Sequence, residues 1–112
     1  MAAALTRSAA QAAEFLRAVA HPGRLRIICV LLEREQTATE LARRVGIRAA
    51  ALSQQAAVLE ARGIITRRRE ARRVLYRLAS PAAADLSKLL YKHFCVSLTR
   101  GRRAGRLPGV SP

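Results

Sequence analysis

The apolar positions of this chain repeat first with the period of an α-helix and later with that of a β-strand. Residues 8–20 form an Ala-rich segment whose larger apolar side chains are Phe15, Leu16 and Val19, which predicts a helix. The next segment, 23–34, has apolar residues at helical spacing and at most of its remaining positions. Because such a helix is apolar nearly all round, we expect it at the centre of the core.

Two shorter helices are expected next. Thr37 and Glu40 have the spacing of a capping box, and Gly46 is a suitable left-handed stop for the first of them. The second covers about 49–62 and is closed by Gly63. Two short helices joined by a few residues around a glycine are typical of a helix-turn-helix unit.

The period then changes from 3.6 to 2. A first strand begins at residues 64–66, and Val74, Tyr76 and Leu78 alternate with other residues in a second strand. Residues 67–77 hold six arginines and form the hairpin between them. A basic hairpin directly after a helix-turn-helix predicts a winged helix, that is, a mainly α fold with a small β-hairpin wing.

The end of the chain divides into a helix and a tail. Pro81 is a suitable start for a final helix of about 20 residues, to near Arg100. The last dozen residues are rich in Gly, Pro and Arg. We therefore predict three regions: a flexible N-terminus at 1–7, a DNA-binding and dimerisation domain at 8–100, and a disordered basic tail at 101–112.

Composition and net charge predict a class of binding partner and an oligomeric state. The 112 residues suit a single domain, and with only 4% aromatic residues the core must be thin, which favours a homodimer. Lys and Arg total 21 against 7 acidic residues, a net charge of +14. This field indicates a polyanionic partner, either nucleic acid or an acidic membrane surface. Genome composition can raise arginine content, but it does not explain the clustering in the hairpin.

Features that the sequence lacks bear on its cellular compartment and on whether it is an enzyme. No apolar run approaches the length of a membrane-spanning helix, and the N-terminal segment lacks the pattern of a secretory signal, so we expect a cytoplasmic protein without membrane contact. Its two cysteines would then be reduced thiols. No carboxylate pair, Ser-His-Asp set or Gly-rich phosphate loop is visible, so an enzyme is not expected.

The helix at 49–62 has the properties of a recognition helix. Its polar side chains are short and uncharged, which suits the major groove, where Gln pairs with adenine and Ser with several bases. The hairpin arginines are expected to follow phosphates or enter the minor groove. Solvated faces remain the alternative interpretation of both segments. The expected DNA-binding residues are Arg48, Ala49, Ser53, Gln54, Gln55, Arg67, Arg68, Arg69, Arg72 and Arg73.

The two cysteines fall on helices that pack together in this fold. Cys29 lies on the apolar stripe of the central helix, and Cys95 lies at the margin of the stripe formed by Leu86, Leu90, Phe94 and Leu98. Lys88 and Lys92 lie beside Cys95 and would stabilise a thiolate. The residues alone leave two interpretations open: a pair of inert core cysteines, or a reactive pair that closes a bridge.

Four stretches carry a family resemblance: LRAVAHPGRLRII, ELARRVGI, ALSQQAAVLEARGII and TRRREARRVLYRL. From about Phe15 to Cys95 the chain resembles the ArsR/SmtB family of winged-helix repressors. The resemblance implies a homodimer that docks two recognition helices, about 34 Å apart, on an inverted-repeat operator of double-stranded DNA and leaves it when an inducer binds. The chain departs from the family pattern at Arg48-Ala49-Ala50 and at Ala71, where the wing usually has a glycine.

The metal sites of the family are not matched. The stretch 36–41 has no thiol or imidazole, and Asp85 and His93 are wrongly spaced for the site of the last helix. We therefore expect no metal site. A site would form only if the fold gathered both cysteines and both histidines.

The stretches HPGRLRIIC, LSQQ and LLYKHFC instead resemble the persulfide-responsive branch of the family. That branch implies that Cys29 and Cys95 become linked by a disulfide or polysulfide bridge when reactive sulfur species or oxidants rise. The bridge would shift the last helix, part of the dimer interface, and release the operator. The alternative is a winged-helix DNA-binding protein without thiol sensing, either architectural or sensing metal or haem. No cofactor is expected, although His93 is a conceivable haem ligand.

Overall fold

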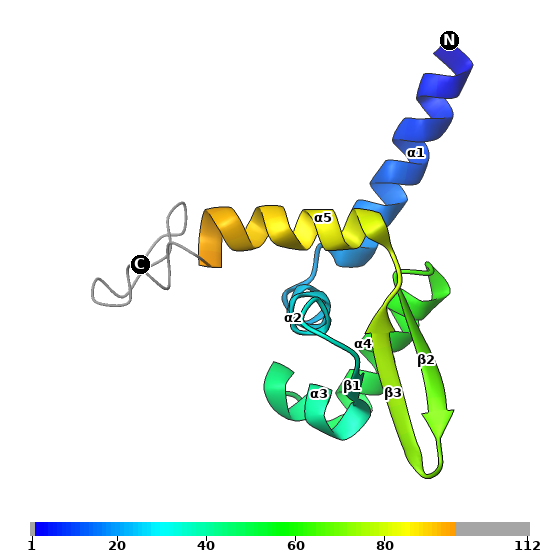
Figure 1. The fold of residues 1–112 in the computed structure, drawn as a ribbon. Helices are drawn as coiled ribbons and strands as arrows, with labels where there is room; N and C mark the ends of the chain where they lie inside the picture. The colour runs from blue at the N-terminus through cyan, green and yellow to red at the C-terminus, as the bar shows by residue number, and fades with distance from the viewer. Residues whose placement is uncertain (1, 96–112) are drawn as a thin grey trace.

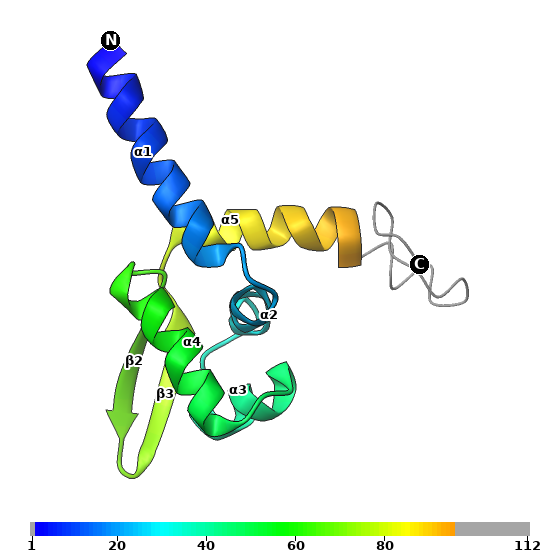
Figure 2. The same cartoon turned by 180° about the vertical axis from the view of Figure 1, so that it is seen from behind.

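The computed structural model describes residues 2–95, apart from the side chain of Cys95. The chain forms a three-stranded antiparallel sheet of order β1-β3-β2 with helices around it. In Figures 1 and 2, α2 is seen end-on between α5 and α3, while α1 and α5 extend beyond the body in two directions. The elements are α1 (Ala2–Val19), α2 (Pro22–Leu31), β1 (Gln36–Thr37), α3 (Ala38–Val45), α4 (Ala49–Ala61), β2 (Ile65–Glu70), β3 (Arg73–Leu78), α5 (Pro81–Leu90) and a π-helix (Tyr91–Cys95).

Helix α1 begins earlier than the sequence pattern predicts. The structure places residues 2–7 in the helix, whereas the predicted start was residue 8. Alanine has the highest helix propensity of any residue, so this Ala-rich run is helical without a buried face. Only Ala18 and Val19 of α1 are buried. The division into a flexible N-terminus, a central domain and a basic tail stays a prediction, and the tail at 101–112 lies outside the described residues.

Helix α2 occupies the centre of the core, as its apolar pattern predicts. Ile27, Ile28 and Leu31 are buried on it. Its start is fixed by Pro22 in the first turn and by His21, whose Nδ1 accepts hydrogen bonds from two backbone N–H groups at the start of α2. The prediction of a central helix is confirmed.

The helix-turn-helix is formed by α3 and α4. Thr37 Oγ1 accepts a hydrogen bond from the Glu40 N–H at 3.1 Å, but the Glu40 carboxylate accepts a hydrogen bond from Arg34 at 2.9 Å and not from the Thr37 N–H. The capping box is therefore half formed. Gly46 has φ 83° and ends α3 in the left-handed conformation that glycine adopts without strain.

The wing is the hairpin of β2 and β3. Glu70 pairs with Arg73, so the turn has only two residues, and Ala71 adopts φ 55°, which is strained for an L-residue. The sequence analysis missed β1, which pairs Gln36 with Tyr76. A two-residue strand leaves no alternating pattern to detect.

The last helix faces the core on the predicted side, but its most buried residues are two small ones that were not predicted. Ala83 and Ser87 are the buried residues of α5, whereas Leu90 is half-buried and Phe94 is 36% exposed. Leu86 packs against the core, and Leu90 and Phe94 line one pocket with Cys29 of α2, so the described part of the predicted stripe faces the core side. The last residues form a π-helix, Tyr91–Cys95, that the sequence pattern did not predict. Leu98 and the predicted end of the helix near Arg100 lie outside the described residues.

Within residues 2–95, no helix is long and apolar enough to cross a membrane.

Candidate DNA-binding surface and thiol site

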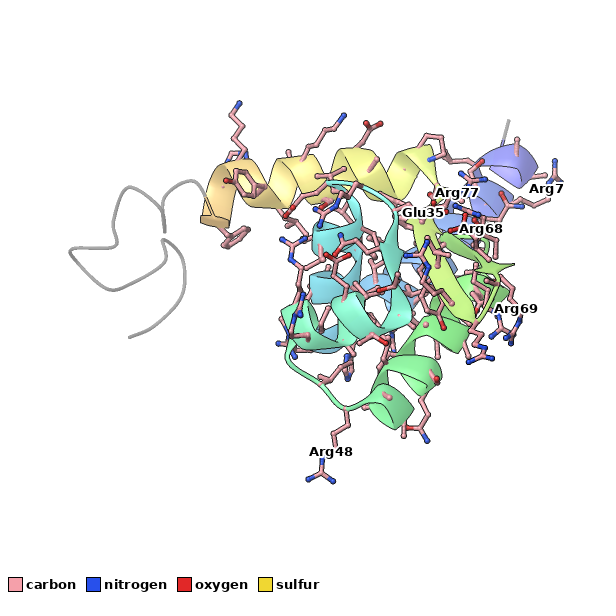
Figure 3. The ribbon with its side chains drawn as sticks, turned by 60° about the horizontal axis from the view of Figure 1, so that its bottom comes forward. Arg7, Glu35, Arg48, Arg68, Arg69 and Arg77 are labelled. Atoms are coloured by element: carbon pink, nitrogen blue, oxygen red, sulfur yellow. The ribbon has the colours of Figure 1, made fainter. Side chains whose placement is uncertain are left out.

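Helix α4 presents two faces with different roles. Leu52, Ala56 and Leu59 are buried against the body, whereas Ser53 and Gln54 are exposed. Arg48 is the N-cap residue, makes no side-chain cap hydrogen bond, and extends away from the body in Figure 3. A helix with a free N-terminal arginine and exposed short polar groups can enter the major groove.

Gln55 lies on the inner edge of α4 and not on its exposed face. It is half-buried, and its Oε1 accepts a hydrogen bond from Arg24 Nη1 at 2.9 Å. The amide oxygen is therefore engaged by α2. All three residues were predicted to contact bases, but only Ser53 and Gln54 are exposed to solvent and able to do so.

The wing arginines divide into paired and unpaired groups. Among the described residues, Arg69, Arg72 and Arg77 form no ion pair with a carboxylate, and Figure 3 shows Arg69 projecting outward from the wing. The other three are paired: Arg67 with Glu60 (3.2 Å), Arg68 with Glu35 (2.8 Å) and Glu70 (3.1 Å), and Arg73 with Glu70.

Two of the carboxylates in these pairs, Glu35 and Glu70, have a lowered pKa. The hydrogen bond from Arg68 holds the pKa of Glu35 below its ordinary value, and hydrogen bonds from Arg73 and then Arg68 do the same for the pKa of Glu70. The wing therefore carries less uncompensated charge than its sequence suggests. Its positive charge without an ion pair lies on Arg69, Arg72 and Arg77.

One basic residue of the helix-turn-helix was missed by the sequence analysis. Every glutamate of the chain pairs with an arginine, but Arg43 on α3 is exposed and has no acidic partner within residues 2–95. Its neighbour Arg44, by contrast, binds Glu33 at 2.7 Å. The sequence does contain a signal for this residue: two consecutive arginines, Arg43 and Arg44, lie on a short amphipathic helix, where at least one of them has to face solvent.

Two shallow grooves lie along the wing. One, of about 220 Å³, is lined by Arg67, Arg68, Arg69 and Val74. The other, of about 460 Å³, lies between residues 37–39 at the start of α3 and residues 72–74 of the hairpin. Arginines line both grooves, so this side of the molecule can accept a polyanion.

Cys29 lies in the wall of an apolar pocket between α2 and α5. The thiol is half-buried, and the Ser87 hydroxyl donates a hydrogen bond to its Sγ at 3.3 Å. The pocket has a volume of about 420 Å³ and is lined by Leu25, Arg26, Cys29, Leu90 and Phe94. The expected packing of α2 against α5 is thus confirmed.

Cys95 ends the π-helix directly after Phe94, which lines the same pocket as Cys29. Its side chain lies outside the described residues. His93, the conceivable haem ligand, is exposed. Within residues 2–95, no group of three or more His, Cys, Asp or Glu side chains could hold a metal ion.

Comparisons with known proteins point to one family. A model of the ArsR family of bacterial regulatory proteins matches residues 21–67. The biofilm growth-associated repressor of Agrobacterium fabrum is 42% identical over 92 residues, which cover 82% of this chain and 79% of the relative.

Two solved structures extend the likeness to the fold. Reduced HlyU from Vibrio cholerae superposes with a TM-score of 0.78 at 35% identity, covering 81% of this chain and 96% of HlyU. A homodimeric winged helix-turn-helix DNA-binding domain from Mycobacterium bovis superposes with a TM-score of 0.68 at 27% identity, covering 89% and 88%. The predicted winged helix-turn-helix fold is confirmed.

Proposed function

Because this chain belongs to the ArsR family of bacterial regulatory proteins, we propose that it is a homodimeric transcriptional repressor. The redox state of its two cysteines controls its affinity for DNA. Its relatives are DNA-binding regulators and not enzymes. In this proposal the reduced dimer binds an inverted-repeat operator. It is released when Cys29 and Cys95 are linked by a disulfide or polysulfide bridge.

The DNA contacts come from α4 and the wing. We place α4 in the major groove, with Ser53 and Gln54 at base edges and Arg48 on a phosphate or guanine. Arg69 and Arg72 reach phosphates or the minor groove, since no carboxylate of the described chain competes for them. The other residues predicted to contact DNA have a secondary role in this docking: Ala49, Gln55, Arg67, Arg68 and Arg73. The three arginines among them must give up an ion pair with a carboxylate before they can bind a phosphate.

The dimer interface is assigned to α1 and α5. Both helices extend from the body (Figure 1), and α1, α5 and the π-helix that follows α5 carry large apolar side chains that are exposed to solvent. These are Leu5 (69% exposed), Leu16 (50%), Leu89 (53%), Tyr91 (50%) and Phe94 (36%). A second copy of the chain would cover them, as the thin core predicts and the homodimeric relative illustrates.

The observation that carries the sensing proposal is the shared pocket of Cys29 and Phe94. In the first step one cysteine thiolate attacks the sulfane sulfur of a polysulfide, and the departing sulfur takes the electron pair of the broken S–S bond. The second thiolate then attacks the mixed species and expels the remaining sulfur group. The two thiols together lose two protons and two electrons, and the polysulfide is reduced.

The bridge acts on DNA through the dimer interface. It fixes the π-helix against α2, and because α5 belongs to the proposed interface, the spacing of the two recognition helices changes. A bridge that disfavours the DNA-competent arrangement by about 2–3 kcal/mol weakens operator binding roughly 30- to 150-fold.

The test is a fluorescence anisotropy titration of a labelled duplex from the chain's own promoter region, at one stated salt concentration. Reduced and polysulfide-treated protein are compared for the wild type, Cys29→Ser and Cys95→Ser. The proposal expects tight binding by all three reduced proteins and treatment-induced loss in the wild type alone. A loss that persists in both variants, or no loss in the wild type, would leave a winged-helix DNA-binding protein without thiol sensing.

A further inference from the structure

Arg24 lies where three helices meet. It belongs to the first turn of α2, and its guanidinium donates in three directions. Nε donates to the carbonyl oxygen of Ala18 and Nη2 to that of Arg17 at 3.5 Å, both in the last turn of α1. Nη1 donates to Gln55 Oε1 on α4 at 2.9 Å. One side chain thus connects α1, α2 and α4.

The hydrogen bonds of Arg24 are of a kind that can hold two helices in a fixed relative position. The last carbonyl groups of a helix have no partner within it and carry the negative end of the helix dipole. Arg24 supplies a permanent positive charge and a planar fork of donors to those carbonyls. The side chain is half-buried, which limits its exchange with water. The joint therefore holds the end of α1 at a defined place relative to α4.

A second contact joins the same two helices. Arg62, at the C-terminal end of α4, binds Glu14 of α1 at 2.6 Å. Helix α4 is therefore tied to α1 at its middle and at its end. Since α1 belongs to the proposed dimer interface and α2 carries Cys29, Arg24 connects both of these helices to the helix that contacts DNA.

We propose that Arg24 is a positioning residue that holds α4 in its DNA-competent orientation, and that Gln55 is its partner and not a base-contacting residue. This rests on the proposed function only in that α4 binds DNA. It adds a role for Arg24 and changes that of Gln55. A movement of α2 at Cys29 reaches α4 through this hydrogen bond.

The first experiment is a double-mutant cycle on reduced protein, with the affinity for one promoter duplex as the readout. Arg24→Met keeps the aliphatic stem of the side chain, and Gln55→Ala keeps helix propensity. If the two residues act as one joint, each variant weakens binding about 10-fold and the double variant is no weaker than the worse single variant. Independent effects that multiply to about 100-fold would overturn the proposal.

Gln55→Glu separates the two roles without disturbing Arg24. A carboxylate accepts the same hydrogen bond from Arg24, so the positioning role predicts DNA affinity within about 3-fold of the wild type. A Gln55 that faces bases or phosphates would place a negative charge against DNA instead. A loss of more than about 10-fold would therefore contradict the proposal.

Controls distinguish positioning from folding and from charge. Arg34→Met makes the same charge change just after α2, at an exposed side chain outside the thiol pocket and the DNA-binding surface, and should change affinity by less than about 3-fold. Arg24→Lys keeps the positive charge but lacks the planar fork of donors, so it should weaken DNA binding as Arg24→Met does. Urea midpoints are measured for every variant, and affinity losses that simply follow the midpoints would refute the positioning role. Failure of the reduced wild type to bind DNA would overturn the proposed function itself.

Discussion

Replacement of Arg69 by Gln should lower the salt dependence of DNA binding by a defined amount. Arg69 is exposed on the wing and has no carboxylate partner among residues 2–95, so its charge is free to displace a counterion from a phosphate. Each such contact contributes about 0.9 to the slope of log affinity against log salt concentration. A homodimer loses two of these contacts, so Arg69→Gln should reduce the slope by about 1.8.

The assay measures affinity for one duplex at several salt concentrations between about 50 and 200 mM. Arg34→Gln is the matched control, because it removes the same charge from an exposed side chain that is paired with Glu33 and Glu40. Its slope should equal that of the wild type. Equal reductions in the two variants would show that net charge, and not a contact of the wing, sets the slope. An unchanged slope in Arg69→Gln would refute the assignment of this residue.

Three further predictions concern stability, each measured as the midpoint of urea unfolding. Ala71→Gly should stabilise the protein by about 0.5–1 kcal/mol, because glycine relieves the strain of φ 55° in the wing turn; a lowered midpoint would contradict this. Thr37→Ala should cost about 1 kcal/mol through the lost cap of α3, with Thr37→Ser as the control that retains the hydroxyl; an unaffected Thr37→Ala would show that the cap is dispensable. Hydrogen bonds from Arg44 and Arg68 lower the pKa of Glu33 and Glu35, respectively, from 4.5. Their contribution to stability is therefore complete above about pH 4.5 and is lost as the pH falls through the lowered values. Glu35→Gln should be less sensitive to pH than the wild type in this range, and an identical pH profile would count against the pair.

The helices and the wing were predictable because their signals are local. Gly46 and Gly63 end α3 and α4 where left-handed residues are needed, and both have positive φ in the structure. The cap at Thr37 is equally local. Such signals act within a few residues and survive whatever the rest of the chain does.

The pairing of the wing arginines was not predictable in the same way. Glu35 lies 33 residues from Arg68, and Glu60 lies on α4 whereas its partner Arg67 lies on the hairpin, so only the packing of these elements brings each pair together. The sequence pattern therefore predicts all five of these wing arginines as DNA contacts, whereas three of them form ion pairs in the structure.

The position of Gln55 could have been predicted from helical spacing. It lies three residues after Leu52 and four before Leu59, and both of these are fully buried. That spacing puts it on the same side of the helix as the core. The π-helix after Leu90, in contrast, follows from no sequence signal that we can identify.

The account depends most on a link between the two sulfurs that controls DNA binding. The most direct measurement treats one sample with increasing polysulfide and follows two quantities together: the fraction of chains in which peptides containing Cys29 and Cys95 are joined, by mass spectrometry, and the fraction of protein that still binds the duplex. The account predicts that binding is lost in proportion to the joined fraction. Complete joining with full DNA binding, or loss of binding without any joined peptide, would contradict it.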